Sequence, residues 1–485
     1  MMNLVKLDIP KKSVAVQAEL TAILERQRTA FLHDGPPDLE QRRARLAKLR
    51  AAILKHRSGL EEAVSADFGH RSRHETDIME VLGILQAIDY LTRHLRIFMK
   101  PQRRHIDFIY RRGHAYVAYQ PKGIIGIVAP WNYPLALTMI PLATALAAGN
   151  RAMIKPSELT PRTSERLHQM MSEIFAEEEV VTILGGAEVG AAFCGLAFDH
   201  LLFTGSTQVG RIVMKAASEN LVPVTLELGG KSPAIIAPGH VNRQTVGNLV
   251  FGKLANAGQT CVAPDYALIH EGDVESFMVQ YSAMVEKFYP QGPTSPDYSS
   301  IINDRHYERL QNLIADARQK GARIIEAGVT PQAAKVRVRT LPPTLIVNAT
   351  DDMKVMQEEI FGPILPVRSW KTMDEVIAFI NARPRPLALY YLGPENDDCR
   401  ALLTHTTSGN VGINNTLMHV AQDDLPFGGV GPSGMGAYHG VEGFRSMSHA
   451  KGVFVQKRWN LPALLRPPFG RLANLSISSK LGKPS

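Results

Sequence analysis

The feature that most restricts the fold is an uncharged stretch, Gly123–Gly149, in the first third of the chain. It is longer than the roughly 20 apolar residues that a membrane-spanning helix needs. Three prolines interrupt it, however, and proline breaks a helix because it lacks a backbone N–H. We therefore predict no membrane span, but a buried strand at Ile124–Ala129 and a buried helix near Leu135–Ala148. A strand at Ala152–Lys155 completes a strand–helix–strand unit, which is the building block of parallel sheets.

The alternation of strand and helix continues through both halves of the chain. Further strands are predicted at Val180–Leu184, His200–Thr204, Val224–Leu228, Ser232–Ile236, Tyr266–Ile269, Thr344–Val347 and Leu387–Leu392. This pattern predicts an α/β fold class with two doubly wound α/β domains. We place the first domain at residues 1–104 and 121–228, and the second at residues 229–444.

A change of period marks a separate element at residues 105–120. Apolar and polar residues alternate on both sides of Arg111-Arg112-Gly113, which predicts a β-hairpin. A two-stranded hairpin is only marginally stable by itself. We therefore expect residues 105–120, with about 445–456, to form an oligomerisation element that pairs with another subunit. The protein would then be a homodimer or a dimer of dimers.

Most of the excess positive charge of the chain lies in its C-terminal tail, residues 457–485. The tail contains no acidic residue and carries Lys457, Arg458, Arg466, Arg471, Lys480 and Lys483. The whole chain has a formal net charge of +8, so these six residues leave the body near +2. A nearly neutral body argues against nucleic-acid binding. The prolines of the tail argue against one long helix, which leaves a solvated tail or a weak contact with anionic membrane surfaces.

Three cysteines, Cys194, Cys261 and Cys399, are too few for a disulfide framework and indicate a reducing compartment. The N-terminal residues include no apolar run of the length found in a signal peptide. We therefore expect a cytoplasmic protein. No clustered His/Cys spacing predicts a metal site.

The segment Gly258-Gln259-Thr260-Cys261 is the strongest candidate for chemistry. It follows the expected end of an amphipathic helix, and its glycine suits a helix terminus or a tight turn. A cysteine on such a turn can face a cleft as a nucleophile, although a free cysteine is also often a small buried hydrophobe. Glu227 falls at the carboxyl end of a predicted strand, where ligands bind in doubly wound sheets. The alternative for Glu227 is an ion pair with Lys231 or another cation.

A glycine turn, Gly205 and Ser206 followed by Gly210, joins a predicted strand to a predicted helix. Such a turn offers free N–H groups at the helix N-terminus, where a pyrophosphate can bind. It departs from the three-glycine dinucleotide fingerprint because Thr207 occupies one of the glycine positions. By itself the segment fits a phosphate-binding loop and an ordinary strand–helix turn about equally well.

Six motifs occur in one order along nearly the whole chain. They are Pro130-Trp131-Asn132-Tyr133-Pro134, Lys155-Pro156-Ser157-Glu158, Phe203-Thr204-Gly205-Ser206, Leu226-Glu227-Leu228-Gly229-Gly230-Lys231, Gly258-Gln259-Thr260-Cys261 and Glu358-Glu359-Ile360-Phe361-Gly362-Pro363. Together they resemble the aldehyde dehydrogenase family. The single threonine before Cys261 and the Val-Ala-Pro after it are similar to the class 3 branch. The run His419–Gly429 looks most like that of the bacterial coniferyl aldehyde dehydrogenases.

The resemblance implies that the first domain is a Rossmann-like NAD-binding domain and the second a catalytic domain. It implies that Cys261 attacks the aldehyde, that Asn132 donates to the oxyanion, and that Glu227 activates the water that hydrolyses the thioester. Cofactor contacts are implied for Trp131, Lys155, Glu158, Gly205, Ser206, Gly210, Glu359 and Phe361. A carboxylate at Glu158 repels the 2′-phosphate of NADP and so favours NAD, although class 3 relatives can use both.

The expected reaction is therefore the NAD(P)-dependent oxidation of an aldehyde to an acid, with coniferyl aldehyde giving ferulate. Fatty or other aromatic aldehydes are alternative substrates, because an apolar pocket binds an acyl chain as well as an aryl ring. A cysteine hydrolase using Cys261 and Glu227 without a nucleotide is a further alternative, since thioester hydrolysis is half of the same reaction. The intact set of Cys261, Glu227 and Asn132 speaks against a protein that keeps the fold without catalysis.

Overall fold

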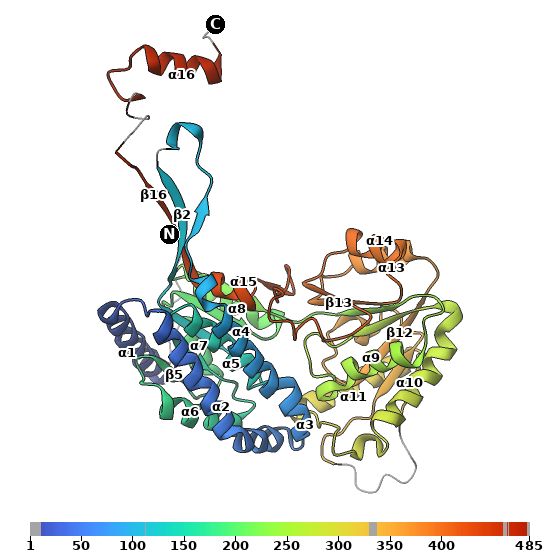
Figure 1. Cartoon of the computed structure of the whole chain (residues 1–485). Coiled ribbons are helices and arrows are strands. Elements are labelled where there is room, and N and C mark those ends of the chain that lie inside the picture. Colours follow the sequence, from blue (N-terminus) through green and yellow to red (C-terminus); the bar gives the residue numbers. More distant parts are fainter. Residues whose placement is uncertain (1–10, 112, 329–336, 459–462, 464, 483–485) are drawn as a thin grey trace, which may run out of the picture.

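The computed structural model describes residues 11–111, 113–328, 337–458, 463 and 465–482. Within these residues, the strands form one sheet of six strands, one of seven and one of three. The two larger sheets belong to two lobes that lie side by side, and the smallest sheet projects from the first lobe (Figure 1). The α/β fold class predicted from the sequence is confirmed.

The first sheet has the strand order β15-β7-β6-β3-β4-β5. Its parallel strands are β3 (Ile124–Val128), β4 (Arg151–Lys155), β5 (Val180–Thr182), β6 (His200–Thr204) and β7 (Val224–Glu227). Every residue of β4 is buried, as expected where helices cover both faces of a parallel sheet. The edge strand β15 (Gly434–Met435) pairs antiparallel with β7. The range 229–444, predicted as the second domain, thus includes a strand of the first sheet.

Helices surround the first sheet. They are α1 (Lys11–Asp34), α2 (Leu39–Phe68), α3 (Arg73–Thr76), α4 (Leu82–Phe98), α5 (Ala136–Ala147), α6 (Pro161–Ile174), α7 (Ala187–Cys194) and α8 (Thr207–Ser218), with a π-helical turn at Asp77–Val81. Helix α2 begins at a capping box formed by Asp38 and Gln41 and ends at Gly69, whose φ of 81° is left-handed. The uncharged stretch noted in the sequence is β3 and α5, and both are buried in the core.

The second sheet has the order β10-β11-β12-β9-β8-β13-β14, and only β10 is antiparallel to its neighbour. Its strands are β8 (Pro233–Ile236), β9 (Tyr266–His270), β10 (Arg323–Glu326), β11 (Thr344–Val347), β12 (Ile364–Trp370), β13 (Ala388–Leu392) and β14 (Asn410–Ile413). Its helices are α9 (Arg243–Leu254), α10 (Val274–Phe288), α11 (Asp304–Gln319), α12 (Lys354–Gln357), α13 (Met373–Asn381) and α14 (Asp397–His405). Short 3₁₀ turns occur at Ala255–Gly258, Glu271–Asp273 and Gly292–Thr294. Helix α15 (Gly440–Ser446) instead packs against α4 and α5 of the first lobe (Figure 1).

The predicted hairpin is present, but its first strand was wrongly positioned. The strand β1 is Gln102–Arg104, and the expected strand residues Phe108–Tyr110 instead form a 3₁₀ turn in the connecting loop. The second strand, β2 (His114–Pro121), pairs with β1 on one side and with β16 (Ser448–Val455) of the same chain on the other. The hairpin therefore has a partner within its own chain, β16, which lies in the range 445–456 that we grouped with the hairpin. Its pairing with another subunit stays a prediction.

The described part of the tail contains a short helix that the sequence analysis did not name. Residues 459–462, 464 and 483–485, which include the predicted charge at Lys483, lie outside the described residues. Beyond the prolines, Arg471–Leu481 forms α16, which lies past the far end of the three-stranded sheet (Figure 1). Among the helices of the described chain, none combines the length and apolar character needed to cross a membrane.

Candidate active site

The predicted nucleophile Cys261 lies on a strained turn between α9 and β9. Helix α9 ends at Leu254, and the turn that follows holds Asn256 and Ala257 in the left-handed region, each with φ of 51°. Gly258 has φ of 76°, and a Cβ there would lie 2.3 Å from the carbonyl oxygen of Gly362. Only glycine fits such a position, so the predicted tight turn is confirmed. Left-handed backbone at non-glycine residues costs free energy and is concentrated at functional sites.

The thiol of Cys261 is half-buried at the wall of a cavity of about 320 Å³. Burial, together with the charges of Glu359 and Glu227, raises the pKa of the Cys261 thiol to about 12. The thiol is therefore protonated at neutral pH in the protein as it stands, because the backbone N–H groups of Cys261 and Val262 only partly offset these effects. Attack on an electrophile consequently requires a base that takes its proton.

Glu227 is one of two carboxyl groups, with Glu359, whose charges act on this thiol. It ends β7, is 2 % exposed, and neither carboxyl oxygen has a hydrogen-bond partner among the described residues. Burial raises its pKa well above the ordinary value. The alternative of an ion pair with Lys231 is wrong, because Lys231 instead contacts Asp265 and donates to the carbonyls of Val355 and Glu358 at 2.8 and 2.9 Å. A buried carboxyl group without a partner is typical of a functional site.

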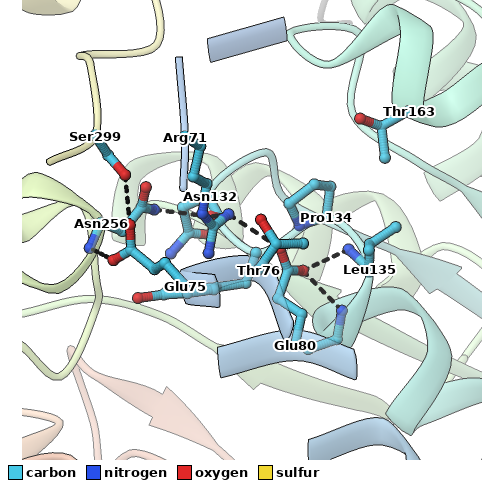
Figure 2. A network of polar contacts seen from close by, with 12 residues as sticks. Arg71, Glu75, Thr76, Glu80, Asn132, Pro134, Leu135, Thr163, Asn256 and Ser299 are labelled. Carbon is cyan, nitrogen blue, oxygen red and sulfur yellow. Dashed lines mark hydrogen bonds and ion pairs between the residues drawn. The ribbon is translucent and has the colours of Figure 1, made fainter. Parts of the chain in front are cut away.

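Asn132 is tied to the turn that carries Cys261. Its Nδ2 donates to the carbonyl of Gln259 at 3.1 Å, and its own carbonyl accepts from Asn256 Nδ2 at 2.9 Å. Figure 2 shows how Arg71 joins this group: its Nη1 donates to the Asn132 carbonyl at 3.1 Å and to Glu80 at 3.0 Å. These bonds fix the position of Asn132 relative to the nucleophile.

The Arg71–Glu80 ion pair is the anchor of this network, since neither side chain is exposed to solvent. Glu80 also accepts hydrogen bonds from the backbone N–H groups of Leu135 and Ala136, at the start of α5 (Figure 2). Burial raises the pKa of Glu80, and Arg71 opposes that rise. The sequence showed no sign of this pair, because Arg71 precedes α3 and Glu80 lies in the π-helical turn, a spacing that no regular helix or strand pattern predicts.

Removing Arg71 is expected to destabilise the fold strongly. Arg71→Ala leaves Glu80 as an uncompensated buried acid, which typically costs about 3–5 kcal/mol of unfolding free energy. The matched control is Arg73→Ala, because the pair Arg73–Glu62 is 61 % exposed on both sides and should contribute less than about 1 kcal/mol. Urea denaturation followed by circular dichroism measures both losses. Equal losses in the two variants would show that the buried pair is not an anchor.

Three of the predicted cofactor residues come together beside Cys261. The ring of Trp131 meets the ring of Phe361 edge-on, with centroids 5.4 Å apart. Glu359 lies so close to Gly229 that a Cβ there would be 2.2 Å from its Oε2. Burial, with the charge of Asp265, raises the pKa of Glu359 to about 7. An aromatic pair next to a carboxyl group suits a ring flanked by hydroxyl groups, which fits the nicotinamide riboside end of the cofactor.

The remaining predicted cofactor residues lie at the carboxyl ends of the first sheet. Lys155, at the end of β4, is buried and forms an ion pair with the exposed Glu158 at 3.5 Å. Ser206 caps α8 by accepting a hydrogen bond from the N–H of Val209, and Gly205 precedes it. Because β3 lies between β4 and β6 and all three strands are parallel, these groups lie at the same end of the sheet.

Gly210 has an evident packing role. A Cβ there would lie 2.6 Å from Leu228 Cδ2, so glycine allows α8 to approach the end of β7. Its predicted contact with the cofactor stays a prediction. In the described part of the chain, no group of three His, Cys, Asp or Glu side chains is arranged to hold a metal ion.

The cavity beside Cys261 brings Tyr133, Asp423 and Phe427, which belong to two of the sequence motifs, together with residues that the sequence did not single out. Its wall is largely apolar and aromatic, with Tyr133, Phe251, Phe427 and Tyr438 among its residues. Its polar groups include Gln86, Asp423 and His439. These residues come from four separate segments, so no local motif could have identified them together.

The comparisons with known proteins agree with this geometry. The model of the aldehyde dehydrogenase family matches residues 10–453. A probable coniferyl aldehyde dehydrogenase of Pseudomonas aeruginosa is 49% identical over 93% of this chain and 94% of its own length. A substrate-bound Staphylococcus aureus AldH structure matches with a TM-score of 0.87 and 36% identity, covering 98% of this chain and all (100%) of that one. The Mycobacterium tuberculosis aldehyde dehydrogenase complexed with NAD⁺ matches with a TM-score of 0.81 and 27% identity, covering 91% and 90% of the two chains. The chain is therefore an enzyme of the aldehyde dehydrogenase family.

Proposed function

We propose that the protein oxidises coniferyl aldehyde to ferulate with NAD, through a covalent intermediate on Cys261. The proposal rests on the Cys261 thiol, which lies at the wall of an apolar cavity. The carboxyl group of Glu227 has no hydrogen-bond partner among the described residues and is close enough to raise the pKa of this thiol. An aldehyde carbon must become tetrahedral before it can release hydride. A thiol in a cavity wall, with an unpaired carboxyl group nearby as a base, meets that need.

In the proposed first step, Cys261 Sγ bonds to the aldehyde carbon while the thiol proton passes to a neighbouring carboxylate. Glu227 and Glu359 are the two groups whose charges act on this thiol. The carbonyl oxygen becomes an oxyanion, and the Asn132 side-chain amide and the backbone N–H of Cys261 are its proposed donors. The loss of one such donor typically costs about 3–4 kcal/mol of transition-state stabilisation.

NAD, when bound, accepts the hydride that the tetrahedral carbon releases. The residues present fit such a cofactor: Trp131, Phe361 and Glu359 would hold its nicotinamide riboside end. Lys155, Glu158, Gly205 and Ser206 would hold its adenosine and pyrophosphate end, with Gly210 allowing close approach of α8. The carboxylate of Glu158 favours NAD over NADP by repelling a 2′-phosphate.

Loss of hydride leaves a thioester on Cys261, which water must hydrolyse. We assign Glu227 to that step as the general base, because it is the buried carboxyl group without a hydrogen-bond partner. It would take a proton from the attacking water, and the thiol would leave as the acid product forms. Burial raises its pKa, and a carboxylate with a raised pKa is a stronger base.

The substrate assignment rests on the aromatic wall of the cavity and on the name of the Pseudomonas aeruginosa relative. It is tested by measuring NADH formation at 340 nm with coniferyl aldehyde, benzaldehyde and decanal. We expect kcat/KM to be highest for coniferyl aldehyde. A tenfold preference for decanal, equivalent to about 1.4 kcal/mol, would instead assign the enzyme to fatty aldehydes. Hydrolysis of an ester or thioester substrate, with no NADH formed from any of the three aldehydes, would instead indicate the cysteine hydrolase.

A further inference from the structure

The wall of the cavity that faces Cys261 carries polar groups for which the reaction itself has no use. His439 is 5 % exposed, and neither ring nitrogen has a hydrogen-bond partner in the described structure. Burial lowers the pKa of His439 to about 4, so its imidazole is neutral, with one donor and one acceptor. Unsatisfied polar atoms are costly when buried. An imidazole that lines a binding cavity in this state is suited to a polar group of the ligand.

Asp423 lies next to His439 in space, although sixteen residues separate them in the chain. Gly440 follows His439 directly, and a Cβ on Gly440 would lie 2.5 Å from the carbonyl oxygen of Asp423. Asp423 is half-buried and lines the cavity, and its carboxyl group has no hydrogen bond to another described residue. Burial raises its pKa to about 6, which leaves it mainly ionised at neutral pH and able only to accept hydrogen bonds.

The position of Asp423 is at the mouth of the cavity. Gln86, Ala421 and Asp423 line both this cavity and a wider surface depression of about 850 Å³. A substrate whose aldehyde group reaches Cys261 would therefore place its far end near these residues. The wall between them is apolar and aromatic, which suits a flat ring.

We propose that Asp423 and His439 form a polar subsite that binds oxygen substituents on the aromatic ring of the substrate. Asp423 accepts a hydrogen bond from a hydroxyl group on the ring, and His439 donates a hydrogen bond to a substituent oxygen on the ring. The inference rests on the proposed oxidation of an aryl aldehyde and adds the residues that select the substrate. A site built to bond a hydroxyl group discriminates strongly against the analogue that lacks it, because its own polar groups are then left unpaired.

The chain offers matched controls for both residues. Asp424 carries the same charge one residue along but is exposed, bonds to Tyr90 Oη and does not line the cavity. His419 stacks on the same Phe427 ring as His439: the ring centroids are 6.4 Å apart for His419 and 5.2 Å for His439. His419 is likewise buried without partners for its ring nitrogens, yet it is not part of the cavity wall.

The experiment compares 4-hydroxycinnamaldehyde with cinnamaldehyde, which differ only in the ring hydroxyl. The ratio of their kcat/KM values is expected to fall at least tenfold in Asp423→Leu and in His439→Phe. In Asp424→Leu and His419→Phe the ratio should match the unmodified enzyme. An unchanged ratio in Asp423→Leu, or an equal loss of rate with both aldehydes, would overturn the subsite.

A binding measurement separates this inference from the proposed function. Isothermal titration calorimetry of the enzyme with 4-hydroxycinnamate and with cinnamate measures the affinity of the subsite for each acid, without any turnover. Asp423→Leu should weaken binding of the hydroxylated acid selectively, by at least tenfold. Selective weakening in an enzyme that oxidised neither aldehyde would refute the reaction and support the subsite. Rapid oxidation of both aldehydes, without selective binding of either acid, would support the reaction and refute the subsite.

Discussion

Cys261→Ala is expected to abolish aldehyde oxidation, with kcat falling at least about a thousandfold, as is typical when a covalent nucleophile is removed. Alanine has no atom that can bond to the aldehyde carbon, so no tetrahedral intermediate forms and no hydride is released. Esterase activity should be lost with it, because the same thiol would form the acyl-enzyme. NAD binding should persist, since the predicted cofactor residues lie on other segments. NADH formation at 340 nm and NAD titration measure the two properties separately.

The matched control is Cys399→Ala. Cys399 is buried at the N-terminal end of α14 and does not line the cavity beside Cys261. This variant should keep its activity. Oxidation in Cys261→Ala at a rate near that of the unmodified enzyme would remove the nucleophile assignment. Loss of NAD binding in that variant would instead mean that the substitution disturbs the strained turn at Asn256 and Ala257.

Glu227→Gln is expected to separate the two halves of the reaction. The amide has nearly the same shape but cannot take a proton from water, and loss of a general base usually slows a step about 10²–10⁴-fold. Acylation should continue, so that NADH appears in a rapid burst followed by a slow steady rate. Stopped-flow absorbance at 340 nm measures the burst, and mass spectrometry of the quenched enzyme detects the acyl group on Cys261.

The pH dependence provides a second test of Glu227. Burial raises its pKa, and only the deprotonated form can act as a base, so deacylation in the unmodified enzyme should speed up as pH rises through that pKa. Glu227→Gln should lose this dependence, and the exposed Glu219→Gln should retain it. Absence of both the burst and the acyl-enzyme in Glu227→Gln would assign Glu227 to the removal of the Cys261 proton.

The hairpin illustrates how far local patterns reach. Alternating residues predicted β2 correctly, because a strand exposes every second side chain to one face. They misplaced β1, since a 3₁₀ turn at Phe108–Tyr110 also brings apolar side chains close together. Nothing in the local pattern indicated β16 as the partner of β2, because residues 448–455 follow more than three hundred positions later. Pairing over such a separation depends on the whole fold.

The sequence by itself determined the fold class, several element boundaries and the chemistry-bearing motifs. The strands His200–Thr204 and Thr344–Val347 have the predicted bounds, because their periodicity and flanking residues are local signals. The motifs around Cys261 and Glu227 could also be recognised from the sequence, because each is a run of consecutive residues.

Only the tertiary structure decided which charges pair and which remain free. It paired Lys231 with Asp265 and left Glu227 without a hydrogen-bond partner among the described residues, which depends on where β7 ends and β9 begins in space. It also buried Arg71 against Glu80 and brought Asp423 and His439 to one cavity wall. Burial and electrostatic contact are properties of the packed chain, so pKa values and substrate contacts cannot be read from the order of residues.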